Sequence, residues 1–399
     1  MENHKTEKQE NSDAIALRSG DDFSGILQPS GAVAPSVPWS GAVRPVKWSW
    51  ACRHVDREDW ERKYTLLSES GLPRAADVVL ASVEKIGHHR YLETDKARRL
   101  RLYRGDLLLC AFGNRYATEV WEGRVLEPTR KNKLHLLSGS GMVGTVVSRH
   151  KDIEPPTAVS LVGYLTDSRG SRVNLRDLCH AFHPEQPSEQ AANVIVVAGT
   201  GMSTGKTTVM RRILHELVLR GFRVAGCKLT GTASQRDLYE MRSTGALLAT
   251  DFSDYGFPST YGAAIPELTA LFDCMVEASS RLQSDIIVME IADGFLQRET
   301  RMLLDSEDFR RRVRGVIVAA PCPGSALCAT DYIEKAGLDV WAVSGLITNS
   351  PLFMQEFSSR SSVRVASSRT GKDLADLVME KLAIRKPKGC RQRAVRTAP

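Results

Sequence analysis

A lysine followed by two threonines closes a loop that is rich in glycine and small hydroxyl residues. The loop consists of Gly199, Thr200, Gly201, Met202, Ser203, Thr204, Gly205, Lys206, Thr207 and Thr208. Glycines let backbone amides converge on an anion, and the N-terminus of a helix adds a positive dipole. We therefore expect this loop to bind nucleotide phosphates, with Lys206 reaching the β- and γ-phosphates and the Thr207 hydroxyl binding Mg²⁺.

The segments on either side of the loop have the patterns that such a site needs. Residues 194–198 are apolar and mostly β-branched, which predicts a buried parallel strand. After the loop, apolar pairs recur every four residues up to Gly221, which predicts a helix over 206–219. Thr200 stands where the common phosphate-loop pattern has its first glycine, so a chance match is the alternative. The strand before the loop and the helix after it argue against chance.

Two further strand ends carry charges that suit a phosphate site. Lys228 closes the strand expected over 222–227, where its charge would lie beside the phosphate loop; an exposed strand end is the alternative. Glu290 closes the apolar run that begins at Asp285. An acid at the end of a neighbouring strand binds Mg²⁺ or its water shell in nucleotide sites.

The longer loop, Gly-Thr, four residues and then Gly-Lys-Thr, resembles that of dethiobiotin synthetase and the cobyrinate-amidating enzymes. The resemblance covers about half of the chain. It implies ATP and Mg²⁺ as cofactors and a small-molecule acceptor that receives the γ-phosphoryl group, as in a ligase. It also makes Lys228 a substrate- and phosphate-contacting residue and matches Glu290 to the glutamate of a Glu-Gly-Ala-Gly-Gly motif. This sequence departs from the family at Leu229, where the family has proline, and in the residues after Glu290.

The same resemblance suggests roles for three further positions. Asp251 and Asp254 would help hold Mg²⁺, with an ordinary packed loop as the alternative. Asn349 would read adenine, with a helix cap before Pro351 as the alternative. The acceptor would be met by this chain's own residues, because the family's glycines are absent there. These acceptor candidates are Asp293, with a catalytic role, and Thr230, Gln297 and Arg298.

The chain divides by composition into five segments. We expect a disordered segment over 1–45, a β-rich accessory domain over 46–150, a connector over 151–192, a phosphate-loop domain over 193–384 and a basic disordered tail over 385–399. Strands alternate with helices from residue 193 onward, which predicts a doubly wound, mostly parallel α/β sheet. The short apolar segments of 46–150 predict a small antiparallel barrel or curled sheet, preceded by a helix over 57–68.

Composition bounds the partners and the compartment. Of the net charge of +7, six positive charges lie in the tail, so the rest of the chain is close to neutral and nucleic acid is not an expected partner. No run of residues is apolar and long enough for a membrane span. Eight cysteines without a Cys-x-x-Cys pair predict reduced thiols and a cytoplasmic protein. The resembled enzymes often work as dimers, so a homodimer is also expected.

Three features of the first 192 residues bear on function. Basic residues alternate with apolar ones from Arg99 to Arg104 and would line one strand face, with a solvated face as the alternative. Arg115, in the loop 113–118, is suited to gripping a carboxylate or phosphate, although an ordinary turn is the alternative. Cys179, His180 and His183 form an incomplete ligand set, so we do not expect a metal there.

Two other functional classes stay open beside the ligase. One is a nucleotide-driven switch or chaperone, an ATPase or GTPase whose β-rich domain binds a protein partner. The relatives that act as switches carry an additional lysine early in the loop, where this chain has Thr200 and Gly201. The other is a small-molecule kinase, which only its product would distinguish from a ligase.

Overall fold

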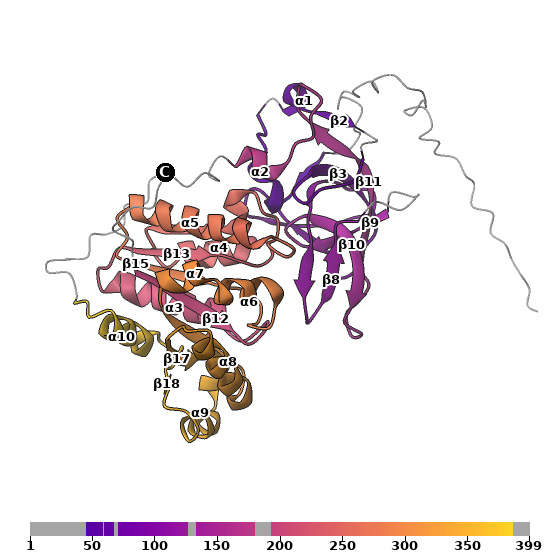
Figure 1. Ribbon diagram of the computed structural model, residues 1–399. Coiled ribbons are helices and arrows are strands. Elements are labelled where there is room, and N and C mark those ends of the chain that lie inside the picture. The colour runs from indigo at the N-terminus through magenta and orange to yellow at the C-terminus, as the bar shows by residue number, and fades with distance from the viewer. Residues whose placement is uncertain (1–44, 59, 68–70, 127–132, 180–192, 386–399) are drawn as a thin grey trace, which may run out of the picture. The chain divides into compact units, whose positions relative to one another are not determined.

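The structure is a computed structural model that describes residues 45–58, 60–67, 71–126, 133–179 and 193–385. The chain divides into two compact units, 1–35 and 36–399, and all described residues belong to the second. The disordered segments that the sequence predicts over 1–45 and 385–399 lie outside the described residues, apart from Pro45 and Arg385. In Figure 1 the β-rich part is drawn in indigo to magenta, and the α/β part follows in pink, orange and yellow.

The β-rich part is organised around one sheet that closes on itself through an additional strand pairing. Its elements are β1 (Lys47–Trp48), η3 (Trp50–Cys52), α1 (Trp60–Lys63), β2 (Thr65–Leu67), β3 (Val78–Lys85), β4 (Tyr91–Glu93), β5 (Arg99–Arg101), β6 (Leu107–Phe112), β7 (Arg115–Ala117), β8 (Trp121–Arg124), β9 (Lys133–Ser138), β10 (Met142–Arg149), β11 (Thr157–Thr166) and α2 (Leu175–Leu178). The strand order is β1-β6-β3-β11-β9-β10-β8-β7, and β6 also pairs with β10. This last pairing closes β6, β3, β11, β9 and β10 into a barrel around a buried core.

Two expectations about this part need correction. The connector expected over 151–192 is wrong in its first half, because β11 lies inside the barrel between β3 and β9. Its Pro155-Pro156 signal marks only the turn that enters the strand. The helix expected over 57–68 shrinks to α1, since Thr65–Leu67 pairs with Tyr164–Thr166 of β11 as a strand. The barrel is largely antiparallel, with parallel pairs at β1–β6 and β6–β10.

The α/β part begins at Asn193 and alternates strands with helices. Its strands are β12 (Asn193–Gly199), β13 (Val224–Lys228), β14 (Leu248–Asp251), β15 (Ile286–Glu290), β16 (Val313–Ala319), β17 (Val340–Ser344) and β18 (Arg364–Val365). Its helices are α3 (Lys206–Leu219), α4 (Gln235–Arg242), η4 (Phe252–Tyr255), α5 (Ile265–Arg281), α6 (Arg298–Asp305), α7 (Glu307–Arg312), α8 (Pro323–Lys335), η5 (Gly345–Asn349), α9 (Pro351–Ser358) and α10 (Lys372–Lys381). The sequence patterns did not predict β14, α6, α7 or α9.

The seven strands form one sheet in the order β14-β13-β15-β12-β16-β17-β18, and every neighbouring pair is parallel. Consecutive residues Val194–Ala198 of the central strand are all at most 1% exposed. Since successive side chains of a strand point to opposite faces, both faces of the sheet are covered. The doubly wound parallel sheet is therefore confirmed, and it brings the carboxyl ends of β12, β13 and β15 to one edge.

Candidate nucleotide site and adjoining cavity

The loop between β12 and α3 has the backbone shape of an anion cradle. Ser203 and Gly205 adopt positive φ angles of 54° and 98°, and Gly205 is the N-cap residue of α3. Left-handed residues alternating with right-handed ones turn successive amides into one concavity. No atom lies within 4 Å of the position that a Cβ would take on Gly201, so the mouth of the loop is open.

Two glycines outside the loop hold it in place, and the sequence analysis did not identify either. A Cβ on Gly345 would lie 2.4 Å from the Thr204 carbonyl oxygen, and one on Gly294 would lie 2.5 Å from the Thr200 carbonyl oxygen. Leu346, which follows Gly345, donates its amide to Thr204 at 3.2 Å. The backbone at the start of η5 and the loop after β15 thus pack directly against the phosphate loop, which only glycine permits.

Lys206 lies in the loop with a buried ammonium group. Its Nζ donates to the carbonyl oxygen of Gly201 at 2.5 Å. Burial lowers the pKa of Lys206, while the carboxylates of Glu290 and Asp293 oppose that change. The ammonium is therefore held over the open loop, close to the first residues a phosphate would meet.

Thr207 and Glu290 lie side by side at the start of α3 and the end of β15. The Thr207 hydroxyl donates to Oε1 of Glu290 at 3.3 Å, and Glu290 is only 2% exposed. A hydroxyl and a carboxylate are the hard oxygen ligands that Mg²⁺ prefers. The residues present therefore fit a magnesium ion bound together with a nucleotide, with one direct ligand and one acid for the metal or its water shell.

Lys228 stands between two carboxylates across the carboxyl edge of the sheet. Its Nζ forms ion pairs with Asp237 of α4 and, at 3.6 Å, with Glu290. Burial alone lowers the pKa of Lys228, but the two acids raise it well above its usual range. The residue is therefore a fixed positive charge beside the magnesium candidates, as expected for a group that neutralises phosphate charge.

Asp293 occupies a strained loop directly after β15. Its φ is 61°, and the preceding Ala292 is fixed at both ends: its amide donates to Thr230 Oγ1 at 3.0 Å and its carbonyl accepts from Thr300 Oγ1 at 3.1 Å. Burial raises the pKa of Asp293, against the opposing charges of Lys206, Lys228 and Arg115. Thr230 therefore has a positioning role here, and its direct contact with a substrate stays a prediction.

A cavity of about 540 Å³ adjoins these residues, and both parts of the described chain line it. The α/β part contributes Met202, Lys228 and Asp293. The β-rich part contributes a cluster of basic and aromatic groups, His88, His89, Arg90, Tyr91, Arg99, Arg115 and Tyr116. Of these, the sequence analysis singled out Arg115 and the basic run that contains Arg99. The histidines escaped it because their neighbours in space are distant in sequence.

The β-rich part also contacts the phosphate loop itself. Ser203 donates its hydroxyl to a carboxylate oxygen of Glu119, in the turn between β7 and β8, at 2.7 Å. Nothing in the local sequence marks Glu119, because a single acid in a polar turn usually faces solvent. The contact places a negative charge from the barrel at the rim of the loop.

Asp251 and Asp254, the other two predicted magnesium ligands, have different contacts. Asp251 caps η4 by accepting from the Ser253 amide at 2.8 Å. Asp254 accepts from Arg53 at 2.5 Å and from Thr250 Oγ1 at 2.9 Å. These bonds join β14 to the β-rich part, so the structure assigns both acids a structural role, and a metal role for them stays a prediction.

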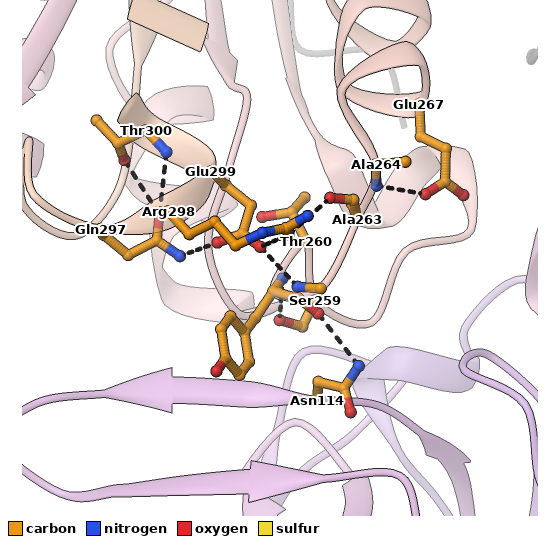
Figure 2. A network of polar contacts seen from close by, with 12 residues as sticks. Asn114, Ser259, Thr260, Ala263, Ala264, Glu267, Gln297, Arg298, Glu299 and Thr300 are labelled. Carbon is orange, nitrogen blue, oxygen red and sulfur yellow. Dashed lines mark hydrogen bonds and ion pairs between the residues drawn. The ribbon is translucent and has the colours of Figure 1, made fainter. Parts of the chain in front are cut away.

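Gln297 and Arg298 face a buried acid rather than the cavity. Figure 2 shows both side chains directed at Glu299, and Arg298 lies 2.7 Å from its Oε1. Gln297 also caps α6, because its side chain accepts from the Thr300 amide at 3.0 Å. Asn114 of the β-rich part, labelled in the same view, donates its Nδ2 to the Tyr261 carbonyl at 3.3 Å. These contacts shape the wall of the site, and the direct acceptor contact expected for Gln297 and Arg298 stays a prediction.

Asn349 lies exposed at the end of η5, the same segment whose first residue packs against the phosphate loop. The cap of the following helix α9 is Ser350, which accepts from the Phe353 amide at 3.3 Å. The capping alternative for Asn349 is therefore wrong. Its contact with a nucleotide base stays a prediction.

The comparisons with known proteins are limited to fold. No family model matches the chain, and no curated protein matches it either. Among solved structures, the signal recognition particle receptor FtsY from Elizabethkingia anophelis is 14% identical with a TM-score of 0.33, covering 53% of this chain and 75% of that one. The signal recognition particle 54 kDa protein from Aeropyrum pernix K1, in complex with GDP, is 15% identical with a TM-score of 0.35, covering 52% of this chain and 50% of that one.

Scores this low carry no argument about activity, so the site itself defines the class. A parallel sheet, a Gly-rich loop ending in Lys-Thr, a helix that begins at the lysine and an acid on the adjacent strand together make a P-loop nucleotide-binding fold. The dethiobiotin synthetase resemblance finds no support in the comparisons. Among the described residues, no group of three or more His, Cys, Asp or Glu could hold a metal ion without other ligands, and none of the described helices is long and apolar enough to cross a membrane.

Proposed function

We propose that this protein is an ATP- and Mg²⁺-dependent enzyme that transfers the γ-phosphoryl group to a small-molecule acceptor. The observation that carries the proposal is the cavity of about 540 Å³ that opens onto Lys228 and Asp293, beside the phosphate loop. Pockets of this size suit small metabolites. A P-loop protein that only hydrolyses nucleotide has no need of a pocket at this position that Arg90, Arg99 and Arg115 line.

The residues divide the work by position and charge. Lys206 and Lys228 place two buried positive charges where negative charge accumulates during phosphoryl transfer. Thr207 and Glu290 would hold Mg²⁺, which supplies neutralisation of phosphate oxygens when it is bound with the nucleotide. Asp293 faces the cavity with a raised pKa, and a carboxylate that has become more basic is suited to accept the proton of an acceptor hydroxyl or amine.

The proposal extends to a ligase, in which an amine attacks the phosphorylated acceptor and displaces the phosphate to form the product. A small-molecule kinase is the variant that stops at the phosphorylated product. Phosphate release separates these two outcomes, because a ligase frees phosphate in step with product and a kinase keeps it on the acceptor. The assay is purified protein with ATP, Mg²⁺ and a small-metabolite extract, followed by fractionation of the extract. Turnover that never depends on the extract would contradict the proposal.

A second candidate function rests on the contact between Ser203 and Glu119. Bound phosphates and the Glu119 carboxylate would both be negative and close to the same loop, so nucleotide occupancy could displace the β7–β8 turn. This is the arrangement of a nucleotide-driven switch whose β-rich part reports to a protein partner. It predicts slow hydrolysis that no small molecule accelerates, and a Glu119→Gln variant that binds nucleotide more tightly. A cytoplasmic location and a homodimer remain untested predictions for either function.

A further inference from the structure

Arg115 is a half-buried cation that has no carboxylate in direct contact among the described residues. Its guanidinium donates to the Leu137 carbonyl and, at 3.1 Å, to Nε2 of His89, while its buried Nε has no hydrogen-bond partner. Burial lowers the pKa of Arg115 to about 10, and only the more distant Asp293 opposes this. The guanidinium still carries its charge at neutral pH, so this position costs folding free energy that no group of the described chain returns.

Three other arginines with little exposure each have an acid in direct contact, which Arg115 lacks among the described residues. Arg53 pairs with Asp254 at 2.5 Å, Arg172 pairs with Asp77 at 3.0 Å, and Arg312 pairs with Asp273. Each of these side chains is at most 17% exposed and has an acid in direct contact. Arg115 has instead two neutral acceptors and the ring of Trp121, whose centroid lies 5.5 Å from its guanidinium carbon.

The groups around Arg115 keep the site positive rather than neutralise it. Burial, with Arg115 as the next cause, lowers the pKa of His89 to about 3, so this imidazole is neutral and accepts from the guanidinium. Three other charged groups that line the cavity are already engaged. Lys228 pairs with Asp237, Arg90 pairs with Glu154, and Glu93 accepts from the Gln235 amide.

We propose that Arg115 is the oxyanion-binding residue of the cavity and that the acceptor of this protein is a small molecule carrying a carboxylate or a phosphate monoester. The guanidinium fork binds either group in a bidentate manner. One end of such a molecule would be held by the barrel at Arg115, and the other would be presented to Lys228 and Asp293. That the bound anion is the phosphoryl acceptor rests on the proposed function, but anion binding at Arg115 can be tested without any nucleotide.

The test uses the full-length protein labelled with 5-fluorotryptophan and observed by ¹⁹F NMR in the absence of nucleotide. Trp121 packs against Arg115, His88 and His89, so its resonance reports on this site, and a Trp121→Phe variant assigns it. The probes are succinate, glycerol 3-phosphate and the uncharged succinamide. All titrations are repeated in the Lys206→Ala background, where the phosphate loop does not contribute.

We expect a saturable shift of the Trp121 resonance with at least one of the two anions and none with succinamide. In Arg115→Gln the apparent affinity for that anion should fall about tenfold or more, because a charge-assisted bidentate contact is lost. The apparent affinity of Arg115→Lys should lie between those of wild type and Arg115→Gln. The control Arg169→Gln replaces an exposed turn arginine of the same part of the chain, and its affinity should match that of wild type. The relative response to succinate and glycerol 3-phosphate identifies the anion.

Two results would overturn the proposal: no saturable shift with either anion, or a shift that Arg115→Gln preserves. Folding of Arg115→Gln is checked by its thermal unfolding midpoint, which should not fall, since the substitution removes a half-buried charge that no acid of the described chain contacts directly. If the anion site is found but extract-dependent ATP turnover is not, then the anion site stands and the proposed enzyme function fails. The reverse result leaves the enzyme and rejects the assigned role of Arg115.

Discussion

The hydroxyl of Thr207 lies 3.3 Å from a carboxylate oxygen of Glu290, although 83 residues separate them. Thr207 is the second residue of α3 and Glu290 ends β15, and the parallel pairing of β12 with β15 brings the two together. Lys228 Nζ lies 3.6 Å from the same carboxylate oxygen. The magnesium candidates and a fixed positive charge therefore share one carboxylate.

The first prediction concerns Glu290. In Glu290→Gln the amide still bonds to Thr207 but loses its negative charge, so Mg²⁺ is held less well. We expect the concentration of Mg²⁺ that gives half-maximal ATP turnover to rise about 10- to 100-fold, with nucleotide binding retained. Turnover is measured against Mg²⁺ concentration at saturating ATP. An unchanged Mg²⁺ dependence would remove Glu290 from the metal site.

Most of this edge of the sheet could be predicted from sequence, for a physical reason. Lys206, Thr207, Lys228 and Glu290 each close or open an element whose apolar pattern is strong, and parallel topology then fixes where those ends meet. The capping role of Asp251 was not foreseen, because an acid after a strand looks the same whether it binds a metal or caps a short helix.

The other half of the site was beyond sequence patterns. The barrel is built from pairings between distant segments such as β6 with β10, which no local period reveals. Glu119, His89 and the two packing glycines Gly294 and Gly345 acquire their contacts only through that long-range arrangement. Arg115 was selected for its chemistry, but its missing partner is a property of the folded chain.

Lys228 should contribute strongly to stability as well as to catalysis. Lys228→Met leaves Asp237 and Glu290 without their shared cation, and breaking a buried ion pair in this way costs about 3–5 kcal/mol. Urea unfolding at neutral pH measures the change in free energy. The control Lys335→Met removes an exposed lysine that pairs with Asp331, and it should stay within about 0.5 kcal/mol of wild type.

Lys228 also determines how the free energy of unfolding changes at alkaline pH. The pKa of Lys228 is raised in the folded state above the unfolded value of about 10.4. Its contribution is therefore fully present below about pH 10.4 and is lost as the pH rises beyond that value. Wild type should lose stability more steeply than Lys228→Met above this pH; parallel curves would contradict the assignment.

Gly345 offers a test of how the phosphate loop is seated. Gly345→Ala places a Cβ 2.4 Å from the Thr204 carbonyl at a residue with φ of 83°. We expect weaker ATP binding, by about tenfold, and a loss of about 1–2 kcal/mol in stability from the left-handed backbone alone. Gly324→Ala in α8, where no atom lies within 4 Å, is the matched control. Equal ATP affinity in both variants would show that the loop does not depend on this contact.

We expect the fold to lose stability in acid because of His89. Its pKa falls from 6.5 to about 3 in the folded state, mainly through burial, so only the unfolded chain takes up its proton between these values. Its contribution to stability is complete above about pH 6.5 and is lost as the pH falls, by about 2 kcal/mol at pH 5. His89→Gln should remove that part of the loss between pH 7 and pH 5, as measured by urea unfolding. His150→Gln, at an exposed position, should retain the wild-type slope.

The most direct test of the account is ADP formation from ATP and Mg²⁺ by wild type and by Lys206→Ala, each with and without a small-metabolite extract, because a ligase and a kinase both form ADP. Lys206 lies over the open loop and contacts only the Gly201 carbonyl through its Nζ among the described residues, so its removal should leave the fold intact. The account predicts extract-dependent turnover in wild type. In the variant this turnover should be lower by a factor on the order of 10² or more. A folded Lys206→Ala protein that keeps wild-type turnover would contradict the nucleotide site.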